Sequence, residues 1–402
     1  MRDGSGNPVA GQEVTFELSR TTGGLTLADV SATTDANGRV AATVISGTIA
    51  TPVRVIATTE RSPADLVNDP ISVVSDSLTV SSGIVTQARF SVGVDTFNPA
   101  AAADINGISV TLTATAYDRF GNAVPDGTAV NFTSECGGIV DPENGGPRGA
   151  CETVNGNCQL EWRSQPAADT VCADNRVTIM AHALGEEAFS DDNGDGYYTN
   201  GESFSDNSEA FRNDNESSDV DGPTYDAGEL FIDLDNDGSF SGATPVANAP
   251  AGLYNGIACV SDGTVCSGDA ISVFSNIEIV AGPLDASSLT VTVEDAAAVL
   301  LDPAVDPMVP GSYVVRVTDA FGNVPPLGTV VSASATGECE VATPDATMSN
   351  SNAQQAFTAG VSIIASGAND ATTTDTITVS VTIPESEGGS DNPNNVVFAC
   401  NL

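Results

Sequence analysis

The amino-acid sequence predicts an all-β protein built from tandem β-sandwich domains, and three observations lead to this prediction. Val, Ala and Ile dominate the apolar residues, and Thr and Ser are common, which is typical of strands rather than of disorder. Short runs of alternating apolar and polar residues recur along the chain, as half-buried strands require. Turn residues separate these runs, and no stretch has the periodicity of an amphipathic helix.

A turn pattern that occurs three times indicates that the chain consists of repeated modules. The pattern is Asp, two residues, Gly-Asn, a Val, a Gly and then a strand, and it begins at Asp3, Asp118 and Asp319. Gly-Asn can adopt the positive φ angles of a tight turn, and Asp can accept hydrogen bonds from the turn backbone. Asp118 lies 115 residues after Asp3, whereas Asp319 lies 201 residues after Asp118, so the middle module must contain an insertion.

We therefore predict a first module at 1–83, a second at 84–282 and a third at 283–402, with boundaries near Gly83 and near Gly282-Pro283. The length of the chain is compatible with this number of domains. A strand is expected before the turn in the second and third modules, and the first module lacks its counterpart before Asp3. Its first strand or strands are therefore expected to be missing, through truncation or because another chain supplies them.

Alternating apolar positions identify the buried faces of the strands. In the second module they are Ile108, Val110, Leu112, Ala114 and Ala116, and in the third they are Leu289, Val291, Val293, Ile377, Val379, Val381 and Ile383. The pairs Asn37-Gly38 and Asn155-Gly156 lie between short strands and predict hairpin turns. Trp162, the only tryptophan, follows Leu160 by two positions and is expected in the core.

The charge of the chain disfavours several classes of partner. There are 54 acidic residues against 12 basic ones, all of them Arg, and the net charge is −42. Such a surface repels phosphate backbones and anionic lipid, so nucleic acid and bare membrane are poor partners. No apolar run approaches the roughly 20 residues that cross a bilayer, and no signal peptide opens the chain. We expect an excerpt of a longer secreted protein, without direct membrane insertion.

Eight cysteines predict disulfide bonds and an oxidising, extracellular compartment. Their number is even, no CxxC pair exists, and the single histidine, His182, has no Cys at zinc-finger spacing. Cys259 and Cys266 are close enough to close a small loop. Cys339 and Cys400 are the only cysteines of the third module and are expected to pair. The remaining four allow three connectivities: Cys136, Cys151, Cys158 and Cys172.

The segment Asp191–Glu202 has the spacing of a twelve-residue EF-hand-type calcium loop. Such a loop supplies oxygens from positions one, three, five, seven, nine and twelve, and has glycine at position six. These positions are Asp191, Asn193, Asp195, Tyr197 through its backbone carbonyl, Thr199 and Glu202, with Gly196 at six. Calcium takes six to eight oxygens at about 2.3–2.6 Å, and this spacing gathers them around one point. The sequence therefore predicts Ca²⁺ as a cofactor.

Two further acidic segments follow the first loop. One repeats its first half but has Thr244 at position twelve, so its last ligand must come from elsewhere; its candidates are Asp233, Asp235, Asp237, Ser239 and Ser241. The other has its spacing one residue off, with candidates Asp219, Asp221, Asp226 and Glu229. Neighbouring sites are expected to be completed by Glu187, Asp206, Glu209 and Asp214. The flanks lack helical periodicity, which indicates bare loops rather than paired EF-hands.

The composition of this region predicts that it needs cations to fold. Between Glu186 and Ser241 there are 17 acidic residues and one basic one, Arg212. The apolar residues available for burial are few, so the segment should not become ordered alone. We place the insertion at about 186–245 and expect it to fold with calcium into a lobe that stiffens the protein or presents a binding face.

The modules resemble the bacterial immunoglobulin-like domain of the invasin and intimin family, often called Big-1. The resemblance is most specific in the first module, in Asp3–Gly11, Val14–Phe16, Thr33–Gly38 and Val40–Val44. The second module resembles a variant in which a strand like Arg176–Ala181 leads into Gly185–Glu187, calcium repeats and a segment like Tyr254–Cys259. The third module is a weaker match, since 348–357 has no Asn-Gly pair.

The resemblance implies tandem immunoglobulin-like β-sandwiches that form a rod on the bacterial surface, in proteins used for adhesion or as stalks. It also implies that Cys151 pairs with Cys158 across the Asn155-Gly156 turn, which leaves Cys136 for Cys172. In the variant the 219–229 stretch is a calcium loop as well, although its spacing here departs from that pattern. The resemblance does not identify a ligand.

Catalysis finds little support in the sequence, and we do not expect an enzyme. His182 stands alone, no Lys is present, and no nucleophile elbow, phosphate loop or dinucleotide fingerprint occurs. The main hypothesis is a calcium-stabilised surface protein whose partner is a host, neighbouring-cell or matrix protein or a glycan. One alternative is a filament subunit that self-associates by strand donation, and the other is a glycan-binding accessory module. Size measurement and glycan arrays separate these alternatives.

Overall fold

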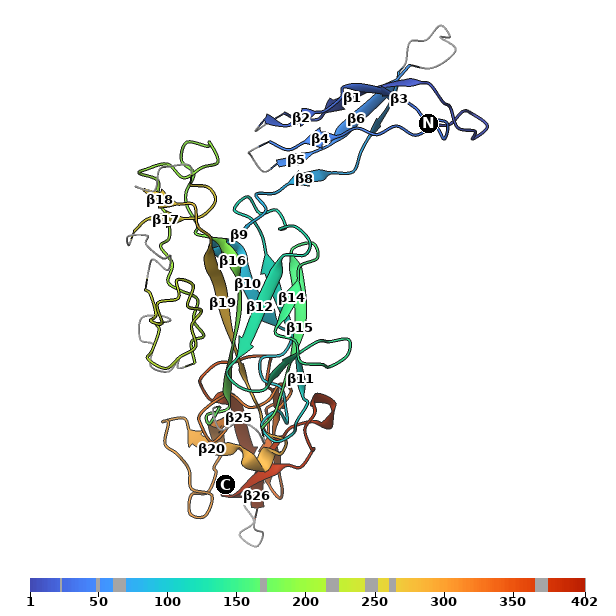
Figure 1. Ribbon diagram of the computed structural model, residues 1–402. Coiled ribbons are helices and arrows are strands. Elements are labelled where there is room, and N and C mark those ends of the chain that lie inside the picture. The colour runs from blue at the N-terminus through green and yellow to red at the C-terminus, as the bar shows by residue number, and fades with distance from the viewer. Residues whose placement is uncertain are drawn as a thin grey trace.

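The computed structural model describes residues 1–402 except 22–23, 48–50, 61–69, 167–171, 215–223, 243–251, 260–264, 366–374 and 402. Within these residues the secondary structure is almost entirely strand, with short 3-10 turns such as η2 (Gln87–Arg89), η4 (Ala286–Ser288) and η5 (Glu385–Glu387). The predicted all-β class of tandem sandwiches is confirmed. Figure 1 shows the sandwiches in succession, with the first module turned away from the other two.

The second module is a sandwich of two antiparallel sheets. One sheet has the order β10-β11-β15-β13, and the other has the order β14-β12-β16-β19 with β9 added in parallel to β16. The strands are β9 (Val85–Thr86), β10 (Phe90–Val94), β11 (Ser109–Ala116), β12 (Ala129–Ser134), β13 (Gly138–Val140), β14 (Ala150–Glu152), β15 (Asn157–Arg163), β16 (Arg176–Glu186) and β19 (Ile271–Val280).

The third module repeats this topology, apart from β9, which has no counterpart among its described strands. Its sheets have the orders β20-β21-β25-β23 and β24-β22-β26-β27. The strands are β20 (Thr290–Asp295), β21 (Gly311–Thr318), β22 (Val330–Ala335), β23 (Cys339–Val341), β24 (Ala346–Thr347), β25 (Phe357–Ala365), β26 (Asp375–Thr382) and β27 (Asn394–Cys400). The same topology in two modules supports the repeat that the turn pattern predicted.

The first module contains one sheet that matches this plan, with the order β3-β1-β6-β7, and two small sheets, β2-β4 and β5-β8. Its β1 begins the Val14-x-Phe16 pattern that β12 repeats as Val130-x-Phe132, so β1 corresponds to β12. The strands are β1 (Glu13–Leu18), β2 (Thr26–Leu27), β3 (Ser31–Thr33), β4 (Val44–Ile45), β5 (Thr51–Val53), β6 (Val55–Thr59), β7 (Ile71–Val74) and β8 (Leu78–Val80).

The cores contain the residues that the alternating pattern selects. Along β11 the buried side chains are Val110, Leu112, Ala114 and Ala116, and along β26 they include Ile377, Val379 and Val381. Trp162 is 1% exposed, and its indole N–H donates to the carbonyl of Cys136 at 2.8 Å. A buried indole therefore has its polar group paired, as stability requires. His182 lies on β16, where burial lowers its pKa.

The eight cysteines form the four pairs that were expected, Cys136–Cys172, Cys151–Cys158, Cys259–Cys266 and Cys339–Cys400. Cys151 lies on β14 and Cys158 on β15, which belong to different sheets. Cys339 on β23 and Cys400 on β27 likewise connect the two sheets of the third module. These two bonds therefore lock the sheets of a sandwich to each other.

Both Asn-Gly pairs form the predicted turns, but the strands that flank them do not pair with each other as hairpins. Asn155 and Gly156 do form a tight turn with positive φ angles of 52° and 76°, and Val154 is bridged to Asn157. However, β14 pairs with β12 and β15 pairs with β11, so the turn crosses from one sheet to the other. The turn at Asn37-Gly38 also leads from β3 to β4, which lie in different sheets. A turn residue reports local φ, and it does not report which strand becomes the partner.

The repeated Asp-x-x-Gly-Asn turn lies at each junction between modules. In the second module Asp118 Oδ2 accepts the N–H of Ser82, which precedes the predicted boundary, at 2.9 Å. In the third module Asp319 Oδ2 accepts from the side-chain amide of Asn175 at 3.2 Å, and Asn323 donates to the carbonyl of Asp174 at 2.8 Å. The turn therefore stiffens the end of its own module and holds the preceding one.

Further bonds make the junction between the second and third modules extensive. The buried side-chain amide of Asn98 donates to the carbonyl of Pro325 at 2.8 Å. Asn350 bonds the backbone of the second module twice, accepting from the N–H of Phe97 at 2.6 Å and donating to the carbonyl of Asp95 at 2.8 Å. Because these contacts use backbone groups on both sides, they constrain the two modules to one relative orientation.

Candidate metal centre

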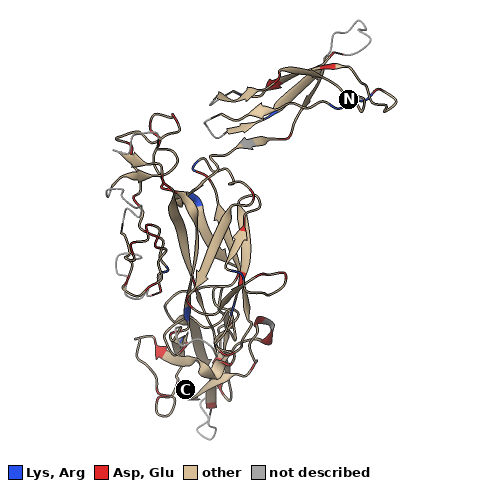
Figure 2. Ribbon diagram, in the orientation of Figure 1, with Lys and Arg blue, Asp and Glu red and all other residues tan. Residues whose placement is uncertain are grey.

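The acidic insertion emerges between two paired strands. β16 and β19 pair from Arg176 with Val280 to Gly185 with Ile271, and the described residues between them, within 187–270, form a lobe beside the second module (Figure 1). Figure 2 shows acidic residues along the loops of this lobe. The lobe is longer than the predicted 186–245, because β17 (Tyr254–Asn255) and β18 (Cys266–Ser267) also belong to it. The apolar, weakly charged sequence after 245 concealed this.

The segment Asp191–Glu202 folds into a closed loop, and hydrogen bonds to the Glu202 carboxylate close it. Glu202 Oε1 accepts the N–H of Asp192, at loop position two, at 2.9 Å, and its Oε2 accepts the N–H of Thr199, at position nine, at 2.7 Å. Asp191 accepts the N–H of Gly196 at 2.9 Å. The acid at position one therefore bonds the glycine at position six, and the acid at position twelve bonds positions two and nine.

The remaining predicted ligands of this loop are folded over one another. Asn193 accepts the N–H of Asp195 at 2.8 Å and donates from its side-chain amide to Thr199 Oγ1 at 3.1 Å. Asp195 Oδ1 accepts the N–H of Tyr197 at 2.8 Å. These hydrogen bonds hold the side chains of loop positions three, five and nine near one another.

The second loop, Asp233–Ser241, is closed by an acid that precedes it in the sequence. Glu209 Oε1 accepts the N–H of Leu234 at 2.8 Å, and its Oε2 accepts the N–H of Ser241 at 2.9 Å. These are positions two and nine of this loop, so Glu209 takes the role that Glu202 has in the first loop. Asp233 accepts the N–H of Gly238 at 3.0 Å, as Asp191 does from Gly196. Glu209 therefore occupies the place that the position-twelve acid holds in the first loop.

Carboxylate oxygens of Glu209, Asp233 and Asp235 lie within 4.8 Å of one another, and in the described part of the chain no other group of three acidic, His or Cys side chains does so. The remaining predicted residues of this loop, Asp237 and Ser239, are joined by a bond of 2.7 Å from the Ser239 N–H to Asp237 Oδ1. Every side-chain atom that these residues offer to a metal ion is an oxygen, which fits a hard cation such as calcium.

The structure describes only part of the third acidic cluster. Glu229 Oε1 accepts the N–H of Asp214 at 2.8 Å, and its Oε2 accepts the N–H of Asp226 at 2.8 Å. Glu229 therefore repeats the pattern of Glu202 and Glu209. The predicted ligands Asp219 and Asp221 lie outside the described residues.

The loops are joined in pairs around aromatic clusters. Phe189 and Phe204 form an antiparallel bridge between chains that flank the first loop. Tyr198 stacks on Tyr254 at 4.7 Å, and both rings meet the two phenylalanines edge to face. A second cluster repeats this arrangement around the bridge of Phe211 with Phe231, and Tyr225 stacks on Phe240 at 4.0 Å. These few aromatic residues form the cores of the lobe.

Glutamates of the lobe are buried where few positive charges surround them. Glu187 and Glu209 are 1% and 0% exposed, and burial raises the pKa of Glu187 to about 7 and raises that of Glu209 as well. Desolvation likewise raises the pKa of Glu229. Each accepts two backbone N–H groups, but the residues described around them offer few cations. A divalent ion would supply the missing charge, so the donor set and its electrostatics fit Ca²⁺.

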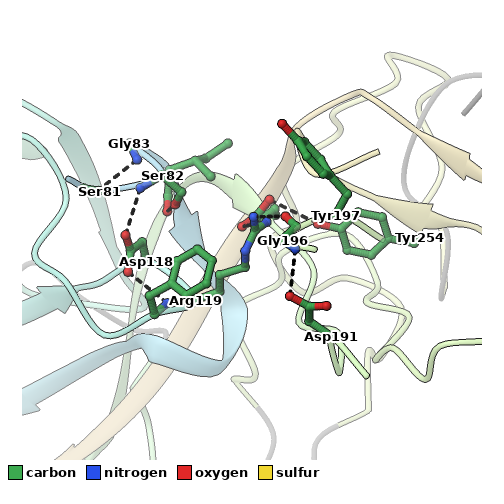
Figure 3. A network of polar contacts seen from close by, with 12 residues as sticks. Ser81, Ser82, Gly83, Asp118, Arg119, Asp191, Gly196, Tyr197 and Tyr254 are labelled. Atoms are coloured by element: carbon green, nitrogen blue, oxygen red, sulfur yellow. Dashed lines mark hydrogen bonds and ion pairs between the residues drawn. The ribbon is translucent and has the colours of Figure 1, made fainter. Parts of the chain in front are cut away.

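Arg119, in the repeated turn of the second module, connects that module to the first loop of the lobe (Figure 3). Among the described residues, Arg119 lies 3.5 Å from Glu186 Oε1 and donates to the carbonyl of Gly196, which is position six of the first loop. Its neighbour Asp118 binds the junction through Ser82. The first loop is thus connected through two consecutive residues to the point where the first and second modules meet.

Residues 1–69 match the family model described as "Bacterial Ig-like domain (group 1)". This match confirms the predicted resemblance for that part of the chain. No curated protein matches the chain. Within the described residues, no helix is both long and apolar enough to cross a membrane.

Three similar solved structures have 13–17% sequence identity to the chain. The adhesin FdeC of Escherichia coli matches with 14% identity and a TM-score of 0.28, over 100% of this chain and 90% of that one. Invasin, titled a bacterial integrin-binding protein, matches with 13% identity and a TM-score of 0.25, over 100% of this chain and 55% of that one. The D0-D1 domain of intimin matches with 17% identity and a TM-score of 0.19, over 45% and 78%.

Proposed function

We propose that this chain is part of a bacterial surface protein, that it serves adhesion or acts as a stalk, and that calcium in its lobe stabilises it. The observation that carries the proposal is the closure of three acidic loops by Glu202, Glu209 and Glu229 with one repeated pattern of hydrogen bonds. Such closures hold carboxylates together although they repel one another, and cations remove that conflict. Ca²⁺ would be held by oxygens of these loops and would act structurally.

A role as a spacer is supported by the junctions. The second and third modules share side-chain to backbone bonds through Asn98, Asn323 and Asn350, which resist bending. The four disulfides add covalent restraint that suits an extracellular compartment. The proposed partner is a host, neighbouring-cell or matrix protein or a glycan. Either this chain binds that partner itself, or it supports another part of the protein that does.

Antibodies raised against the folded chain test the surface location. They are expected to label intact bacteria that make the protein, and the same labelling should persist after permeabilisation. Competition by the purified chain then separates the two roles: an adhesive segment reduces attachment of the bacteria to their target surface, whereas a stalk leaves it unchanged. Labelling that requires permeabilisation would contradict the proposal, since the epitopes would then lie inside the cell.

A further inference from the structure

The segment Gly252–Asn255 completes a loop that begins 46 residues earlier in the chain. Gly252 donates its N–H to Asp206 Oδ2 at 3.1 Å, a contact with a sequence separation of 46. In the first loop the position-six Gly196 donates in the same way to Asp191 Oδ2 at 2.9 Å. The φ angles of the two glycines, 82° and 83°, also agree. Relative to Asp206, Gly252 therefore occupies loop position six.

Glu187 closes this split loop as Glu202 closes the first one. Its Oε1 accepts the N–H of Asn207, the residue after Asp206, at 3.0 Å, and its Oε2 accepts the N–H of Asn255 at 2.8 Å. Asn207 is therefore position two and Asn255 is position nine. In the other closures, too, one carboxylate oxygen accepts from position two and the other accepts from position nine.

The aromatic residue at position eight agrees with this assignment. Tyr254 precedes Asn255, as Tyr198 precedes Thr199, and the two tyrosine rings stack at 4.7 Å with an interplanar angle of 17°. The split loop and the Asp191–Glu202 loop thus form a pair about the bridge between Phe189 and Phe204. The residues of the second aromatic cluster, from Phe211 to Phe240, lie between Asn207 and Gly252 in the sequence and therefore belong to an insertion in the split loop.

The side chain of Asn255 gives an independent indication of a ligand. The residue is 0% exposed, and its side-chain amide donates to the carbonyl of Leu253 at 2.9 Å and to Glu187 Oε1 at 3.4 Å. Its Oδ1 is buried and accepts no hydrogen bond. A buried acceptor without a partner is costly, and such atoms call for a bound water or ion. A cation in the split loop would give this oxygen a partner and would offset the charge of the Glu187 carboxylate, which the same side chain contacts through its amide nitrogen.

We propose that Asp206, Glu187 and Asn255 bind a calcium ion in this split loop. The inference rests on the proposed function, since it assumes that the lobe binds calcium, but it adds a site that spacing along the sequence does not reveal. Position nine carries a neutral amide here, and affinity of such loops falls with fewer charged ligands. The ion would tie Gly252–Asn255 to Glu187, the residue that follows β16, and would therefore hold both ends of the lobe together.

Ion counting by native mass spectrometry during a calcium titration tests the site. Asp206→Asn is expected to bind at least one ion fewer than the unmodified chain. Asp269→Asn is the matched control, because Asp269 is an exposed acid of the same lobe that bonds only Ser267 among the described contacts, and it should keep the full count. An Asp206→Asn chain with the full count would overturn the inference. An unmodified chain that binds no calcium would overturn the proposed function as well.

A second variant covers the case in which Asp206→Asn fails to fold. Asn255→Asp adds a carboxylate at position nine, next to Glu187. If a cation lies there, the rise in melting temperature from chelator to calcium is expected to be larger for Asn255→Asp than for the unmodified chain. If no cation lies there, the new charge meets only the Glu187 carboxylate, and the rise will be unchanged or smaller. That second result would overturn the inference.

Discussion

Chelation of calcium is expected to unfold the lobe while the third module stays folded. The segment from Glu186 to Ser241 has 17 acidic residues and one basic residue, and the aromatic clusters alone bury little apolar surface. Extracellular calcium loops typically bind at about 10⁻⁴–10⁻³ M, so about 2 mM calcium contributes roughly 0.6–1.8 kcal/mol for each ion. With several ions this sum is comparable to the stability of a small domain.

Hydrogen exchange followed by mass spectrometry measures this directly. Peptides that cover Glu187–Glu209 and Glu229–Ser241 should exchange slowly in calcium and quickly after chelation, because the amides bonded to the closing glutamates lose their partners. Peptides from β25 and β26 serve as the internal control and should not change. Magnesium at the same concentration should protect less, since it demands a near-ideal octahedral site. Equal protection of the lobe with and without calcium would contradict the account.

Removal of the disulfide Cys339–Cys400 is expected to cost the third module about 4 kcal/mol. The bond spans 61 residues and joins β23 to β27, which lie in opposite sheets. A loop of this length gains about 4 kcal/mol by restricting the unfolded chain in the chain-entropy model. Both cysteines are buried, so the double variant Cys339→Ala/Cys400→Ala leaves no polar group behind.

Chemical unfolding of this double variant, followed by circular dichroism, measures the loss as a shift in the transition of the third module. The control is Cys259→Ala/Cys266→Ala, which opens a loop with a separation of only 7 in the lobe. This control should leave the transition of the third module in place, because the lobe lies on the second module. A shift equivalent to less than about 1 kcal/mol for Cys339→Ala/Cys400→Ala would show that the loop-closure argument does not apply here.

The fold was predictable where strands alternate strictly. The buried faces of β11 and β26 follow from Val110–Ala116 and Ile377–Val381, since period-two patterns report which side faces the core. The positions of the turns were predictable, but the pairing partners of the strands that they connect were not. Asn155-Gly156 has the φ angles of a hairpin, yet the flanking strands pair elsewhere because each sheet selects partners by long-range packing.

The candidate site was predictable where one loop supplies its own closing acid. Asp191–Glu202 contains all positions within twelve residues, so its spacing is readable from the sequence alone. Glu209 closes a loop that begins 24 residues later, and only folding brings its carboxylate to Asp233. Asn255 was missed altogether, because it is neutral and lies beyond the acidic region. A repeated Glu-x-Phe motif, at Glu187, Glu202, Glu209 and Glu229, was the sequence feature that could have revealed the closures.

The lobe is connected to the junction between the first and second modules, so calcium bound in its loops would affect the stiffness of that junction. Arg119 bonds the first loop at Gly196, and Asp118 bonds the segment before the second module at Ser82. A filled loop would hold Gly196, and through Arg119 it would restrain the turn that supports the first module (Figure 3). Calcium would then stiffen the lobe and the junction together, which suits a protein extended from a cell.

The central claim, that oxygens of the Asp191–Glu202 segment bind calcium, is tested most directly by diffraction from crystals grown in about 2 mM calcium, a concentration above the typical dissociation constant of such loops. Data collected at long wavelength reveal calcium by its anomalous scattering. The account predicts an anomalous peak enclosed by Asp191, Asn193, Asp195 and Glu202, and another beside Glu209, Asp233 and Asp235. A well-ordered lobe without any peak at these residues would contradict it.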